Sequence, residues 1–152
     1  MPAYAAMQMN STSPIPGDGV YRSLTGFFLD TNRRDFLLDD GINLMVPTMG
    51  LYLLNAEVYW AGGYIVTNAW QSARFRFTGP SVDGFAGLVK SPQIQDPREA
   101  NYQISTAIQF LTAGTRVRVE VAHRNAYGQY VNCWMKALLL QEIDLIHIDP
   151  GV

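Results

Sequence analysis

Cysteine is almost absent from this chain: Cys133 is the only one in 152 residues. A single cysteine cannot form a disulfide within the chain, so we expect synthesis in a reducing compartment. The surrounding segment, VNCWMKALLL, is mostly apolar. These neighbours favour a buried small side chain over a reactive thiol.

Motifs that would support catalysis are also lacking. The two histidines, His123 and His147, belong to no HExxH motif, and the chain contains no nucleophile elbow and no glycine-rich phosphate loop. A Ser/His/Asp arrangement assembled by the fold is the alternative that the sequence leaves open. We expect a protein that is not an enzyme, needs no cofactor and uses His123 as an ordinary strand-end or interface residue.

Charge of one sign is not concentrated anywhere, and no apolar run approaches 18 residues. The 11 basic and 13 acidic residues are scattered and give a formal charge of −2, so nucleic acid is not an expected partner. Without a basic segment followed by an apolar core, we expect neither a signal peptide nor a membrane span. Nine arginines accompany only Lys90 and Lys136, a choice that suits protein interfaces and equally reflects codon usage.

What the chain does have is apolar material for one domain with a sizeable core, since 48% of its residues are hydrophobic. Residues 1–19 contain Pro and Gly breaks and suit an arm or a first short strand. We predict the domain itself over 20–143, followed by a tail over 144–152.

The segment GLYLLNAEVYW (50–60) predicts a strand with two different faces. Its even positions, from Tyr52 to Trp60, are all apolar, as expected for a core face. Its odd positions begin as Leu51 and Leu53 and then become polar at Asn55 and Glu57. The second face therefore needs a covering that is apolar at one end.

Further strands follow at short spacing. Alternating or apolar residues between turn signals predict them over 20–30, 36–47, 72–80, 102–111, 116–125 and 130–143. Asp40-Gly41 marks a turn, TNRRD a hairpin turn before Phe36, and 80–101 a long connection. The strand over 130–143 alternates little, which is typical of burial on both faces. This pattern predicts an all-β antiparallel sandwich of the jelly-roll type.

Two residue groups have competing interpretations. The carboxylates of Asp30, Asp35, Asp39 and Asp40 could bind calcium, but they match no EF-hand loop and lie beside arginines. Solvated loop charges are the favoured explanation, and no metal site is expected. Most aromatic residues fall on core faces. Those left for contacts are Trp70, Tyr102, Tyr127 and Tyr130.

Three segments resemble, in order, landmarks of the tumour-necrosis-factor-like and complement globular-head jelly-roll superfamily. They are NLMVPTMGLYLLNAEV (43–58), STAIQFLTAGTRVRVEV (105–121) and YGQYVNCWMKALLL (127–140). Thr115 replaces the usual acidic residue, and Ala137 stands at the usual small or Gly position. The resemblance implies a sandwich of about ten strands and a homotrimer around a threefold axis, which would cover the second face of the inner sheet.

The resemblance also implies candidate functions, because its members include trimeric ligands, heads on stalks and bacteriophage proteins. A cysteine-poor chain made in the host cytoplasm, with no stalk, fits a virion component best. We expect a trimeric capsid decoration (cement) protein on the capsid surface that binds the major capsid protein or another virion protein. The alternatives are a receptor-binding head or tail-fibre tip that recognises a host glycan or protein, and a bacterial trimer of the same fold.

We assign six residues to the trimer interface and six to the virion partner. The trimer interface residues are Leu51, Leu53, Tyr59, Cys133, Met135 and Leu139. The partner-contact residues are Tyr4, Met7, Met9, Leu145, Ile146 and Ile148.

Overall fold

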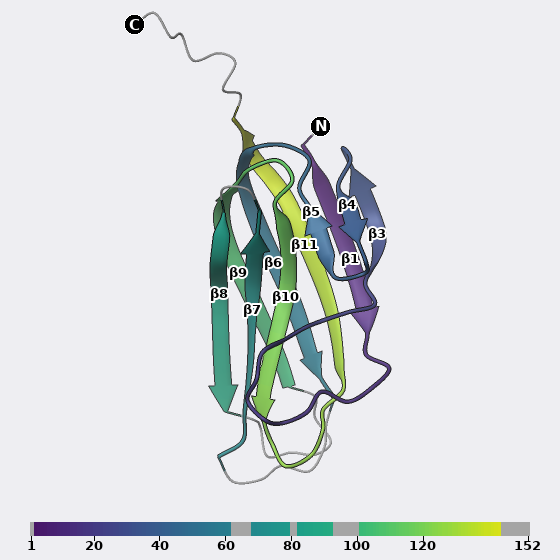
Figure 1. Ribbon diagram of the computed structural model, residues 1–152, viewed down its shortest axis with the longest axis vertical. Helices are drawn as coiled ribbons and strands as arrows, with labels where there is room; N and C mark the ends of the chain where they lie inside the picture. Colours follow the sequence, from purple (N-terminus) through teal and green to yellow (C-terminus); the bar gives the residue numbers. More distant parts are fainter. Residues whose placement is uncertain (1, 62–67, 80–81, 93–100, 144–152) are drawn as a thin grey trace, which may run out of the picture.

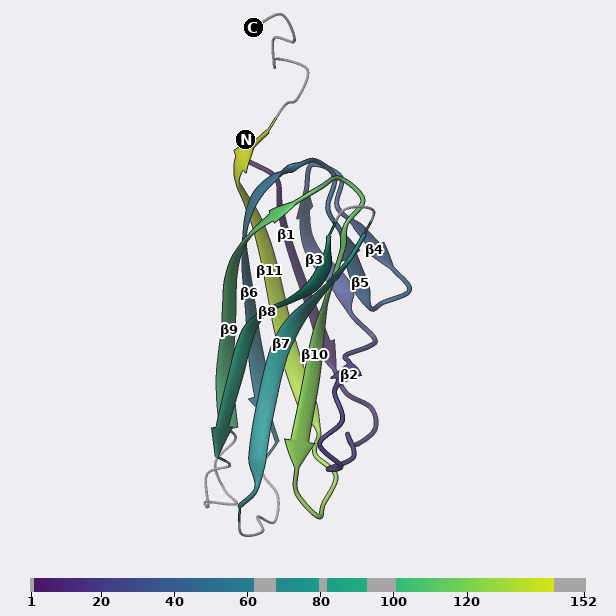
Figure 2. The same cartoon turned by 60° about the vertical axis from the view of Figure 1, so that its left-hand side comes forward.

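The computed structural model describes residues 2–61, 68–79, 82–92 and 101–143, which form eleven strands in two packed sheets (Figures 1 and 2). Sheet I contains, in spatial order, β3 (Phe28–Arg33), β1 (Tyr4–Asn10), β11 (Val131–Glu142), β6 (Gly50–Trp60) and β9 (Asn101–Leu111). Sheet II contains β4 (Leu37–Asp39), β5 (Asn43–Met45), β10 (Arg116–Arg124), β7 (Trp70–Thr78) and β8 (Asp83–Pro92), and β2 (Arg22–Ser23) pairs with β10. All pairings are antiparallel, which confirms the all-β jelly-roll sandwich.

The chain passes repeatedly from one sheet to the other. After β6 it crosses to sheet II for β7 and β8, returns for β9, crosses again for β10 and ends in sheet I with β11. Strands β9, β6 and β11 therefore lie next to one another although they are far apart in sequence (Figure 2). Within the described residues, no helix is long and apolar enough to cross a membrane.

Strand β6 has the two faces that its sequence predicts. Every even position from Tyr52 to Trp60 is fully buried between the sheets, whereas the odd positions are only partly covered or exposed. Gly50 begins the strand where the backbone of Gln141 passes so close that a Cβ would overlap its carbonyl oxygen. The residue is glycine because β11 carries an irregularity between Leu139 and Gln141 at this point.

Strands β7 and β10 provide the opposing half of the core. Val117, Val119 and Val121 are fully buried and pair in register with Phe77, Phe75 and Ala73. Arg118, between Val117 and Val119, points to the outer face, as the alternation predicts. Each large apolar side chain buried in this way contributes about 1.5–3 kcal/mol to folding.

A buried polar network closes one end of the core. The Trp60 indole donates to Gln103 Oε1 at 2.9 Å, and Gln103 Nε2 donates to Ser91 Oγ at 2.8 Å and to the Gln71 carbonyl oxygen at 3.0 Å. Asn101 Nδ2 donates to Gln71 Oε1 at 2.5 Å. These bonds tie β9 to β7 and β8 across the sandwich, because polar groups placed there need partners inside the protein.

The turn predicted at Asp40-Gly41 is confirmed. It joins β4 to β5 through residues 40–42: the Ile42 amide donates to the Asp39 carbonyl oxygen at 3.1 Å, and both central residues of this turn have positive φ, 53° and 68°, as a turn of type I′ requires. The hairpin predicted across TNRRD is wrong. Strand β3 pairs in sheet I and β4 in sheet II, so residues 34–36 cross between the sheets. Local polarity shows that the chain turns there but not which sheet it enters.

Strand pairing corrects two other predictions and decides one alternative. Residues 83–92 of the predicted long connection form β8, which pairs with β7 through a bulge at Gly87, where φ is 65°. Residues 4–10, for which the sequence left an arm or a first short strand open, form the strand β1, paired on both sides within sheet I. Strand β11 is not enclosed on both faces of the single chain, since its even positions from Asn132 to Lys136 are exposed.

Met135 tests the core assignment because it is fully buried at the centre of β11. Replacing it with alanine removes buried methylene groups and leaves a cavity, so we expect Met135→Ala to lower the free energy of unfolding by about 2–5 kcal/mol. Asn132→Ala, on the exposed side of the same strand, should change it by less than about 0.5 kcal/mol. Urea denaturation measures both. Equal losses for the two variants would show that β11 has been assigned the wrong inward face.

Candidate self-association surface

The outer face of sheet I carries an extensive exposed apolar area. Its side chains come from β9, β6, β11 and β1, whose register places them in rows across the sheet. One such row joins Ile108, Leu53, Leu138 and Tyr4. Ile108, on the edge strand β9, is 63% exposed. Contiguous exposed apolar surface of this kind marks an interaction site.

One end of this face is aromatic. The ring centroid of Tyr59 lies 4.5 Å from that of Tyr102 and 5.4 Å from that of Trp134, the latter in an edge-to-face arrangement. Partial removal from water and the nearby Glu57 carboxylate raise the pKa of Tyr102. The cluster is rigid because three strands hold the rings against one another, so it offers an ordered contact surface.

The opposite end is also apolar, and there Leu51 pairs with Phe110 across β6 and β9. Between the two ends lies a hollow of about 350 Å³, whose lining is mostly apolar but includes Asn55, Thr106 and Lys136. Asn55 Nδ2 donates to Thr106 Oγ1 at 3.1 Å within it, and Lys136 supplies a positive charge. Asn55 is therefore satisfied inside its own chain.

The predicted interface residues divide into two groups by strand face. Leu51, Leu53 and Tyr59 lie on the outer face of sheet I. Cys133, Met135 and Leu139 are in the core, at most 5% exposed, and cannot contact another chain, so their assignment is corrected. The error is one of register: odd positions of β11 pair with even, inward positions of β6.

Sequence reasoning missed several residues of this face. They are Ile104, Ile108, Phe110, Trp134, Leu138 and Leu140. A signal was present in QISTAIQF (103–110), where Ile104, Ile108 and Phe110 share one parity. Which parity faces outward was not evident, because the buried positions of β9 include the polar Gln103 and Ser105.

The predicted partner-contact residues are also divided. Tyr4 lines the hollow on the outer face of sheet I. Met7 and Met9 are corrected, since both are buried in the core as inward residues of β1. Leu145, Ile146 and Ile148 lie outside the described residues.

His123 and Cys133 lie in environments that are typical of structural residues. His123 is fully buried, and its Nε2–H donates to the Ile15 carbonyl oxygen at 2.6 Å while the ring packs edge-to-face on Trp60. Its Nδ1 has no partner among the described residues, whereas a catalytic triad needs a carboxylate there. Burial lowers the pKa of His123 and raises that of the Cys133 thiol, which keeps both groups neutral.

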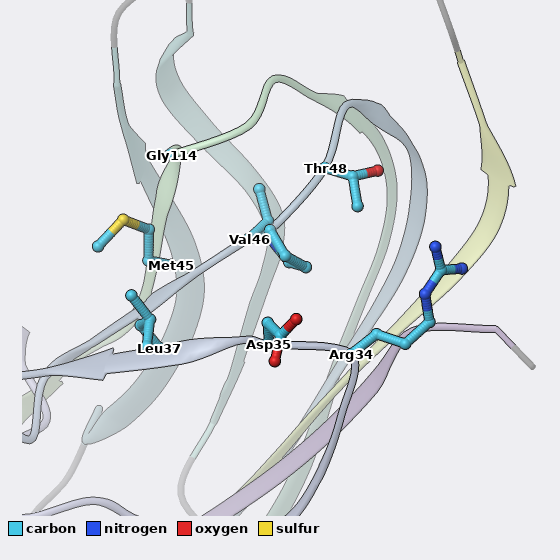
Figure 3. Close-up of a pocket in the computed structure, with 8 residues that line it drawn as sticks. Arg34, Asp35, Leu37, Met45, Val46, Thr48 and Gly114 are labelled. Atoms are coloured by element: carbon cyan, nitrogen blue, oxygen red, sulfur yellow. The ribbon is translucent and has the colours of Figure 1, made fainter.

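A separate pocket of about 400 Å³ opens where β4, β5 and the turn at Gly114 meet (Figure 3). Leu37, Met45 and Val46 form its apolar part. Arg34 points away towards β11, where its guanidinium donates to Glu142 at 3.4 Å. The described lining holds no histidine or cysteine.

The aspartates considered as calcium ligands are distributed over both sheets. Asp30 belongs to β3 of sheet I, whereas Asp39 belongs to β4 of sheet II and accepts a hydrogen bond from Arg116 at 2.9 Å. Within the described ranges, no three His, Cys, Asp or Glu side chains are grouped for metal binding.

Comparison with known proteins identifies the fold. No family model matches the sequence, and no curated protein does. Among solved structures, Eiger TNF from S. frugiperda shares 20% identity with a TM-score of 0.61, covering 100% of this chain and 99% of that one. The globular domain of zebrafish complement 1qA shares 13% identity with a TM-score of 0.66, covering 93% of this chain and 99% of that one. Murine APRIL shares 13% identity with a TM-score of 0.65, covering 90% of this chain and 99% of that one. The chain has the TNF-like and C1q-like jelly-roll fold.

The buried His123 makes stability depend on pH. Because its folded pKa lies below the unfolded value of about 6.5, the unfolded chain binds the proton more readily as pH falls. The contribution of His123 to the free energy of unfolding is therefore at its maximum above about pH 6.5. At lower pH the free energy of unfolding decreases by up to about 1.4 kcal/mol per pH unit. We expect His123→Gln to lose this slope in urea denaturation between pH 7 and 5. Subtracting the unfolding free energy of the variant from that of the parent chain cancels the contribution of His147, which both contain. Parallel pH profiles for the two chains would contradict the role given to His123.

Proposed function

We propose that this protein is a homotrimeric structural component of a virion, a decoration protein that binds and stabilises a phage head. The observation that carries the trimer is the exposed apolar outer face of sheet I. A monomer leaves Ile108, Phe110 and Leu140 in water, whereas three copies around an axis bury them. At about 25 cal/mol per Å² of apolar surface, covering such a face contributes substantially to association.

The virion assignment has a different support. It comes from the sequence resemblance, whose members include head-decoration proteins, and from a chain that holds its fold without disulfides. The proposed role is structural and non-catalytic. Its proposed partners are further copies of the chain and the major capsid protein, on the capsid surface.

A receptor-binding head or tail-fibre tip is the second candidate. The loop between β10 and β11 favours it, because Tyr127 and Tyr130, three positions apart in this loop, are both about half exposed. Exposed tyrosines on loops are common in recognition surfaces, since they bury large area with little loss of side-chain freedom.

The trimer makes a direct prediction about mass. Sedimentation equilibrium should give three times the chain mass of 17.0 kDa. Ile108→Glu should give the mass of one chain with unchanged circular dichroism, because an unpaired charge buried at an interface costs several kcal/mol. The matched control is Leu37→Glu, an exposed leucine on the other sheet, which should remain trimeric. A monomeric parent chain, or a trimeric Ile108→Glu variant, would overturn the proposed trimer.

Imaging of purified particles tests the virion role. We expect trimeric density on the head surface by electron microscopy, and particles lacking the protein should lose their contents at a lower temperature. Density at the tail tip with none on the head would replace the decoration role with receptor binding. Absence of the protein from the particles would reject both roles while leaving the trimer to be judged by its own measurement.

A further inference from the structure

The outer face of sheet II concentrates positive charge on a chain that is acidic overall. Among the described residues, six of the ten Lys and Arg side chains project from it, against three of the nine Asp and Glu side chains. The basic residues are Arg74, Arg76, Lys90, Arg116, Arg118 and Arg124; the acidic ones are Asp39, Asp83 and Glu120. The face carries a formal charge of +3, whereas the whole chain carries −2.

The acidic residues leave the central arginines incompletely neutralised. Glu120 is shared, because it accepts from Arg74 at 2.9 Å and from Arg118 at 3.4 Å. Arg76 pairs at 3.0 Å with Asp83, whose side chain is 70% exposed. Arg76 and Arg118 also face each other directly across β7 and β10. Like charges in that position repel, so an anion bound over them would stabilise the pair.

These arginines are held in place before any partner arrives. The Arg74 guanidinium is stacked between the rings of Tyr21 and Phe85, at 3.7 and 3.8 Å from their centroids. Arg76 lies over the same Phe85 ring at 4.4 Å. Ordered guanidinium groups bind carboxylates with little further loss of side-chain freedom.

Apolar side chains lie beside the charges on strand β8. Phe85 is 50% and Leu88 65% exposed, both on the outward side next to β7. Arginine combined with exposed aromatic and aliphatic side chains is typical of protein interfaces. A sulfated polysaccharide or a nucleic acid backbone would satisfy the charges but leave Leu88 uncovered.

We propose that the outer face of sheet II docks a protein partner whose contact surface is acidic around an apolar centre. Carboxylates of the partner bind Arg76 and Arg118, and an apolar side chain packs on Phe85 and Leu88. The inference goes beyond the proposed function and does not depend on it, because this face is opposite the self-association surface and is present on a single chain.

Fluorescence anisotropy with two labelled 12-residue peptides, one of Glu-Glu-Leu repeats and one of glutamate alone, tests the proposal at 0.15 M salt. We expect the mixed peptide to bind more tightly and Arg76→Gln/Arg118→Gln to weaken both peptides at least tenfold. Leu88→Ser should weaken only the mixed peptide, by about threefold or more. Arg33→Gln, which removes a cation from sheet I, is the matched control and should change neither.

Other results would overturn the proposal. No binding of either acidic peptide rejects the surface, and equal effects of Arg33→Gln and the double variant show that only net charge matters. A heparin fragment that binds more tightly than both peptides, unaffected by Leu88→Ser, would make the occupant a polysaccharide. Circular dichroism and thermal melting of each variant ensure that weaker binding is not unfolding. A monomeric mass for the parent chain would reject the proposed trimer without affecting these measurements.

Discussion

Packing of alternate side chains between the two sheets is the interaction on which the rest of the molecule depends. The inward row of β6, from Tyr52 to Trp60, meets Phe75, Phe77 and the valines of β10, and all are fully or almost fully buried. Because successive strand residues point to opposite faces, this packing also fixes which residues point outward. Both outer surfaces are thus consequences of the core.

The two outer faces are chemically different. Sheet I exposes isoleucine, phenylalanine, tyrosine and tryptophan around a shallow hollow, whereas sheet II exposes arginines stacked on aromatic rings. An apolar face suits copies of the same chain, because desolvation drives association without charge complementarity. A charged face with apolar anchors suits a different partner of opposite charge. The sandwich separates these surfaces by its full thickness.

Much of the fold was predictable from period-two alternation. The strand containing Tyr52 was predicted with the correct inward face, the segments containing Phe75 and Val119 were predicted as strands, and the turn at Asp40-Gly41 was predicted in its place. Prediction failed where alternation was weak. Strand β8 was hidden by glycine and proline, and apolar residues of both parities in β11 concealed that Cys133 and Met135 point inward while Trp134 points outward.

The sequence by itself determined that this chain forms an antiparallel β-sandwich, because local alternation and turn residues act over a few positions. The same alternation indicated that the second face of LYLLNAEVYW needs to be covered. Only the tertiary structure decided which residues lie next to this face. Ile108 of β9 and Trp134 and Leu138 of β11 join Leu53 and Tyr59 through pairings between residues far apart in sequence. The arginine face has the same origin, since Arg76 and Arg118 become neighbours only when β7 pairs with β10.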